Sequence, residues 1–193
     1  MERIQKDERL RVDAYIKKEG LCPDDPEWHA ALQEYDHRID FLLPRFFRGP
    51  FLVALYAVYE SAVTEIARLT QEKKSQKITI NDLKGGFLER AKKYYKHILE
   101  FDLYSEEKVW HRVKMLSELR NAFAHVNGRL EMLNKKSRDT IQKWEQQKLG
   151  ISSHYGYIIC EASTVEDIFG TVRTSLEDLV TRYKHWDDEQ THT

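Results

Sequence analysis

The sequence is poor in cysteine, in charge of one sign and in long apolar runs, and each shortage excludes a class of protein. Its 193 residues include two cysteines, Cys22 and Cys160, too few for a disulfide framework or a zinc site built of thiolates. The formal net charge is -1, so no global basic field marks a nucleic-acid-binding protein, and any RNA contact must be local. No apolar run approaches the roughly 20 residues that span a bilayer.

Other features are missing as well. Residues 1–11 are densely charged and lack the apolar stretch of a signal peptide, so we expect a soluble cytoplasmic protein with no membrane partner. There is no internal repeat and no low-complexity tract. The length suits one domain with a real core. We therefore expect a single domain over residues 1–193, with a charged N-terminal segment at 1–23 and a short disordered tail at 187–193.

What the sequence does contain is helical periodicity along most of its length. Capping residues precede Glu27, and apolar residues then recur at helical spacing as far as Pro44, which predicts a first long helix. After Gly49 and Pro50, residues 51–69 carry a wide apolar arc, which indicates a helix buried on most sides. This helix is expected to form the centre of a bundle.

Further helices are expected downstream. Asn81 and Asp82 cap one helix, and Ser105 opens another that should stop near Gly128. Residues 137–148 read as a short polar helix, the alternation in 150–160 indicates a small β-hairpin, and Thr164 begins the last helix. The prediction is an all-α, up-and-down helical bundle of four to five main helices, with the small insert before the last one.

The helix that should end near Gly128 has two distinct faces, at about 100° per residue. Its predicted core arc contains Met115, Leu116, Leu119, Ala122, Phe123 and Val126. The opposite line contains Trp110, Lys114, Ser117, Asn121 and His125. Such a line is in most helices a solvated surface. A tryptophan pointing away from the core, however, more often marks an interface, so we expect a second copy of the chain to cover Trp110 in an isologous homodimer.

Three side chains near the end of this helix can cleave a phosphodiester without a metal. The guanidinium of Arg120 binds phosphate oxygens, and the imidazole of His125 exchanges a proton near neutral pH. Asn121, one turn before His125, would orient the imidazole or bond a phosphate oxygen. The sequence therefore predicts a ribonuclease site with Arg120, Asn121 and His125 as catalytic residues, and no metal or cofactor.

An all-helical chain with Arg120, four intervening residues and His125 resembles the HEPN family (higher eukaryotes and prokaryotes nucleotide-binding), whose pattern is Arg, four to six residues, His. Asn121 is a residue type that the family often places after the arginine, and the resemblance covers residues 27–183. It implies a metal-independent endoribonuclease that acts as a homodimer and leaves 2′,3′-cyclic phosphate and 5′-hydroxyl ends, commonly in toxin–antitoxin, phage-defence or RNA-processing settings. In one subgroup an antitoxin modifies a tyrosine at the position of Asn127, so an antitoxin here would act by binding alone.

Several residues are expected to support this site. Ser117 and Lys114 share the line of His125, and Glu60, in the most apolar helix, needs a partner such as Arg120 or else lies on a wet stripe with Thr64. The basic cluster of Lys135, Lys136 and Arg138 follows the motif closely and is expected to bind the RNA backbone, although most such runs are merely solvated.

Two interpretations of the motif that involve no catalysis remain open. The chain could be a helical module of the same fold that binds RNA, a nucleotide or a partner protein without cutting. Alternatively, Arg120 and His125 could serve only the negative end of their helix dipole.

Overall fold

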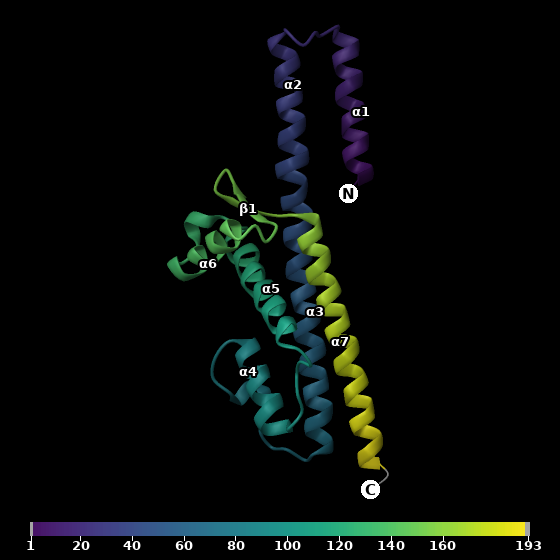
Figure 1. Ribbon diagram of the computed structural model, residues 1–193, viewed down its shortest axis with the longest axis vertical. Helices are drawn as coiled ribbons and strands as arrows, with labels where there is room; N and C mark the ends of the chain where they lie inside the picture. The colour runs from purple at the N-terminus through teal and green to yellow at the C-terminus, as the bar shows by residue number, and fades with distance from the viewer. Residues whose placement is uncertain (1, 192–193) are drawn as a thin grey trace.

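The long helix α3 (Leu43–Lys73) forms the centre of the bundle in the computed structural model, which describes residues 2–191. Figure 1 shows α5 (Glu107–Val126) and α7 (Ala162–Thr191) lying beside it along much of its length. The other elements are α1 (Glu2–Glu19), α2 (Pro26–Asp36), η1 (His37–Leu42), η2 (Ile80–Asp82), α4 (Phe87–Tyr94), η3 (Tyr95–Leu99), η4 (Leu130–Met132), α6 (Lys135–Gln146), β1 (Ile151–His154) and β2 (Tyr157–Cys160). This confirms an all-α bundle with a small β-hairpin before the last helix.

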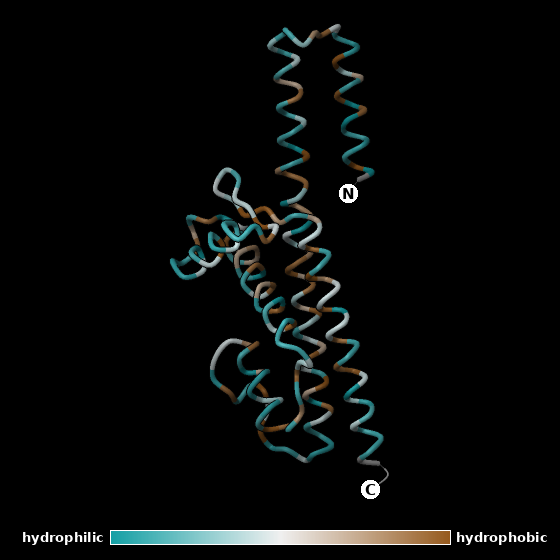
Figure 2. The backbone as a smooth tube through the Cα atoms, viewed as in Figure 1, coloured by the Kyte–Doolittle hydropathy of each residue, from teal (hydrophilic) through white to brown (hydrophobic). Residues whose placement is uncertain are grey.

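The core lies where α3, α5 and α7 meet. Its fully buried side chains include Leu52, Tyr59 and Val63 from α3, Leu116 and Leu119 from α5, and Ile168 and Leu179 from α7. Figure 2 shows hydrophobic segments along α3 in this region, whereas the hydrophilic colour dominates the outer ends of the molecule. Burial of these side chains is the main free energy that holds the bundle together.

The helix through Pro44 and Pro50 is continuous, and the predicted break at residues 44–50 is wrong. Helices α2, η1 and α3 follow one another without a loop. In the π-helix η1 the Leu43 N–H donates to the Arg38 carbonyl, five residues back, so the backbone bonds ahead of Pro44 are redistributed. Pro50 lies exposed inside α3, and the helix runs on because the residues after it are buried.

This continuous helix, Pro26–Lys73, is long and apolar enough to pass as a membrane span by length and composition alone. The expectation that no apolar run approaches the length of a membrane span is therefore not met by length and composition. The core helix of a soluble protein passes the same test when it is mostly buried; here 33% of the apolar stretch is buried, and the part of the helix in α3 packs against α5 and α7.

The N-terminal segment forms a helical hairpin that projects from the bundle. Helices α1 and α2 lie side by side and extend beyond the rest of the molecule (Figure 1). Within the described residues, one cation–π contact joins the two helices: the Arg9 guanidinium carbon lies 5.4 Å from the centre of the Tyr35 ring. The first buried apolar residue of the described chain is Ile39, in η1. The α1–α2 helical hairpin therefore contributes no residue to the buried core.

Other predicted boundaries shift. Thr79 and Asp82 form a capping box on the short turn η2, and the helix predicted to begin at residues 81–82 starts only at Phe87, as α4, after Gly85 adopts a φ of +117°. Helix α7 continues to Thr191, so residues 187–191 are helical and the disordered tail predicted at 187–193 is wrong for them; residues 192 and 193 lie outside the described part.

Candidate functional site

Helix α5 ends where the sequence predicts. Asn127 adopts the left-handed conformation, with φ +51°, and its N–H donates to the carbonyls of Ala122 and Phe123. Gly128 follows with φ +72°. The predicted core arc is confirmed, since Met115, Leu116, Leu119, Ala122 and Phe123 are buried and Val126 is half-buried. The motif therefore stands on the last turns of a helix whose opposite face is fixed in the core.

Arg120 is held by a neighbouring helix and by its own neighbour in sequence. Its guanidinium carbon lies 5.5 Å from the centre of the Tyr56 ring in α3. One guanidinium nitrogen donates to Asn121 Oδ1 at 2.9 Å. Arg120 is half-buried and Asn121 is exposed. The side chain is thus oriented by a cation–π contact and a hydrogen bond while its outer part stays accessible.

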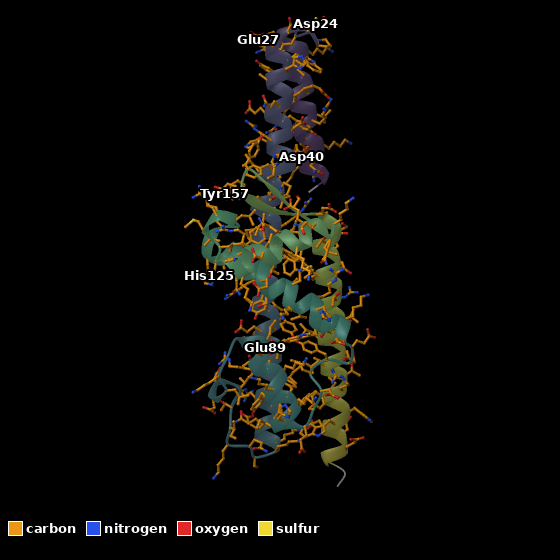
Figure 3. All side chains as sticks on the ribbon, turned by 60° about the vertical axis from the view of Figure 1, so that its left-hand side comes forward. Asp24, Glu27, Asp40, Glu89, His125 and Tyr157 are labelled. Atoms are coloured by element: carbon orange, nitrogen blue, oxygen red, sulfur yellow. The ribbon has the colours of Figure 1, made fainter. Side chains whose placement is uncertain are left out.

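His125 is exposed at the end of the same helix. Across residues 2–191 its ring takes part in no hydrogen bond, ion pair or ring contact. The expected bond from Asn121 to the imidazole is absent, because Asn121 Oδ1 accepts from Arg120 instead. Figure 3 shows His125 at the outer edge of the molecule, between the levels of Tyr157 in the hairpin and Glu89 in α4. Arg120 and His125 both reach solvent, as predicted, but no contact within one subunit fixes the imidazole.

Tyr56 is a site residue that sequence reasoning missed. Its hydroxyl accepts from Ser117 Oγ at 3.5 Å, which places Ser117 beside the ring that Arg120 contacts. Burial raises the pKa of Tyr56 above its ordinary value. The apolar arc of α3 contains Tyr56, so the sequence identified the residue as core but gave no sign that its ring would face α5.

The predicted partnership of Glu60 with Arg120 is absent. Glu60 is half-buried, and within the described chain no hydrogen bond or ion pair joins its carboxylate to Arg120. Thr64 is half-buried as well, so the alternative of a partly solvated stripe shared with Thr64 fits better. Lys114 is exposed and contacts none of these residues.

Trp110 is half-buried and packs against residues of its own subunit. Its ring centre lies 5.6 Å from that of Tyr104, and Lys92 Nζ lies 4.5 Å from the ring centre. Lys92 belongs to α4 and Tyr104 to the loop before α5. These segments cover the first residue of the line that runs from Trp110 to His125. Trp110 alone is therefore not an argument for a second subunit.

The residues of the basic cluster after the motif differ in their contacts and exposure. Arg138 donates to the carbonyls of Leu130, Glu131 and Leu133 at 2.8 to 3.1 Å and so holds the turn η4 together. Nε and one of the two Nη atoms of Arg138 are thus engaged within the chain. Lys135 and Lys136 are exposed and line a shallow depression with Asp139, Thr140 and Lys143.

Among the described residues, no group of three or more His, Cys, Asp or Glu is arranged to hold a metal ion. Comparison of the chain with protein-family models, with curated proteins and with solved structures finds no match in any of the three.

Proposed function

We propose that the protein is a metal-independent endoribonuclease of the HEPN type, active as a soluble cytoplasmic homodimer. The observation that carries the proposal is the position of Arg120 and His125 on the last turns of α5, where both reach solvent while Tyr56 orients the arginine. A toxin or phage-defence setting, with or without an antitoxin protein, is part of the proposal.

In the proposed reaction, His125 removes the proton from a ribose 2′-hydroxyl, whose oxygen attacks the adjacent phosphorus. The P–O5′ bond breaks, and the leaving oxygen takes up a proton from an acid, for which the imidazole of a second subunit is available. Arg120 stabilises the charge that builds on the non-bridging oxygens. The products carry a 2′,3′-cyclic phosphate and a 5′-hydroxyl.

The alternative is a module that binds RNA, a nucleotide or a partner protein without cleaving it. The absence of any contact to the His125 ring in the described chain favours it, since a general base is normally held by a neighbouring group.

Incubation of purified protein with total RNA in EDTA tests the proposal. We expect fragments that end in cyclic phosphate, and we expect His125→Ala and Arg120→Ala each to lower cleavage by at least about a hundredfold, the usual size of a general acid–base or oxyanion contribution. The matched control is His111→Ala, which removes an exposed histidine from the first half of the same helix. Undiminished cleavage by either site variant would refute the assignment, and no cleavage by the parent protein would favour the binding module.

A further inference from the structure

The β-hairpin is attached to the chain immediately after the motif. The Ile158 N–H donates to the Gly128 carbonyl and the Leu130 N–H donates to the Gly156 carbonyl, each at 2.9 Å. Three residues of fully extended chain span at most about 11 Å, so the Cα of Gly128 lies within that distance of the Cα of His125. The second strand, β2, therefore borders the proposed cleavage site.

Two guanidinium groups flank Tyr157 on this strand. The Arg45 guanidinium carbon lies 3.7 Å from the ring centre, and the Arg129 Nε donates to the Tyr157 hydroxyl at 2.9 Å. Arg45 also donates to the Asn127 carbonyl at 3.5 Å, which ties the pair to the end of α5. Within the described residues Arg45 has no ion-pair partner, and Arg129 meets only Glu131, at 4.0 Å. The positive charge of the pair is thus largely uncompensated, and it favours an anion.

The tip of the β-hairpin carries a tyrosine in a backbone conformation that is unfavourable for a bulky residue. Tyr155 and Gly156 form the two-residue loop, with φ of +49° and +77°, and a type I′ turn requires positive φ at both positions. Asparagine suits the first position, whereas a bulky residue there is strained. Tyr155 is nevertheless 68% exposed, although its ring lies 4.2 Å from the ring of His154, 5.4 Å from Phe41 and 5.8 Å from His37. Strained residues of this kind persist where function uses them.

We propose that this hairpin tip binds single-stranded RNA beside the cleavage site. The ring of Tyr155 stacks on one base, and the guanidinium groups of Arg45 and Arg129 attract the neighbouring phosphates. An exposed aromatic ring next to largely uncompensated cations is the usual composition of surfaces that bind single strands with little sequence preference. The choice of RNA as ligand rests on the proposed function, and the hairpin becomes an element that holds the substrate.

The test measures RNA binding and stability in the same variants. The full-length chain carries His125→Ala to prevent cleavage, and the probe is a short fluorescein-labelled RNA of mixed sequence followed by anisotropy. Tyr155→Asn should weaken binding roughly tenfold or more, the usual effect of losing one stacked base. The same change should leave the chain folded in thermal unfolding, because asparagine accepts the left-handed conformation with less strain, which offsets the lost ring contacts with His154, Phe41 and His37.

Two further variants serve as controls. Tyr155→Phe keeps the ring and should bind as tightly as the parent. Phe169→Ala removes a 42% exposed ring from α7 and should leave binding unchanged.

Binding by Tyr155→Asn as tight as that of the parent would overturn the inference. So would the absence of RNA binding by the parent, which is the result expected if the tip contacts a protein. The cleavage assay in EDTA decides the ribonuclease proposal separately. Weaker binding by Tyr155→Asn together with no cleavage by the wild-type chain would support the hairpin site and refute the nuclease.

Discussion

At the scale of single residues, the two main groups of the site are held very differently. Arg120 is fixed by Tyr56 and Asn121, whereas the His125 ring has no contact in the described chain. A catalytic group contributes most when its position is settled before the reaction. In the proposed ribonuclease, the imidazole would therefore gain its orientation from bound RNA or from a second subunit, whereas the arginine is already oriented within one subunit.

A pair of tyrosine hydroxyls in the core gives a prediction at the same scale. Tyr59, 1% exposed, and Tyr104 share a hydrogen bond of 2.5 Å between their hydroxyl oxygens. Burial raises the pKa of Tyr59 well above its ordinary value, so its hydroxyl stays protonated. Tyr104→Phe leaves this hydroxyl without a partner and should lower the free energy of unfolding by about 1–3 kcal/mol in urea denaturation.

The double variant with Tyr59→Phe should recover most of that loss, because removing both partners leaves nothing unsatisfied. Tyr15→Phe, at an exposed position of α1, is the neutral control. A double variant less stable than Tyr104→Phe alone would contradict this account.

At the scale of elements, α3 shows what local sequence rules leave out. Pro44 and Pro50 predict breaks, since proline in a helix interior costs about 3 kcal/mol. The helix continues because the residues after Pro50 bury their side chains against α5 and α7. Burial of several large side chains at about 1.5–3 kcal/mol each exceeds that cost. The local sequence around Pro50 contains the proline but carries no information on the helices against which the following residues will pack.

Two helical glycines give the prediction for elements. A Cβ at Gly49 in α3 would lie 2.7 Å from Phe123 Cδ1 in α5, whereas a Cβ at Gly170 in α7 would meet no atom within 4 Å. Gly49→Ala gains up to about 1 kcal/mol of helix propensity but loses about 1–3 kcal/mol to overpacking. We expect a net loss of stability in thermal or urea unfolding.

Gly170→Ala has no such clash and should stabilise the protein by roughly 0.4–1 kcal/mol. Equal effects of the two substitutions would show that α3 and α5 do not approach each other as closely as the structure has them. Because Phe123 lies on the motif helix, Gly49→Ala should also reduce cleavage.

At the scale of the whole molecule, the α1–α2 hairpin makes the subunit elongated (Figure 1). An elongated particle elutes early in gel filtration, so its apparent mass there is too high. Sedimentation equilibrium does not depend on shape. We expect it to report twice the chain mass of 23.0 kDa at micromolar concentration, in keeping with the proposed homodimer. A mass of one chain across the micromolar range would contradict the dimer, and with it the second imidazole of the proposed mechanism.

The sequence by itself determined most of the helical segments from residue 27 onward, where the hairpin lies, which face of α5 is buried and that Asn121 and His125 share the opposite line. These follow from periodicity and turn chemistry, which act between residues near one another in the chain. Only the tertiary structure decided that Tyr56 orients Arg120, that Trp110 packs against Tyr104 and that β2 is joined to the chain just beyond His125. Each of these contacts joins segments whose approach depends on how the whole core packs, a property that no local pattern contains.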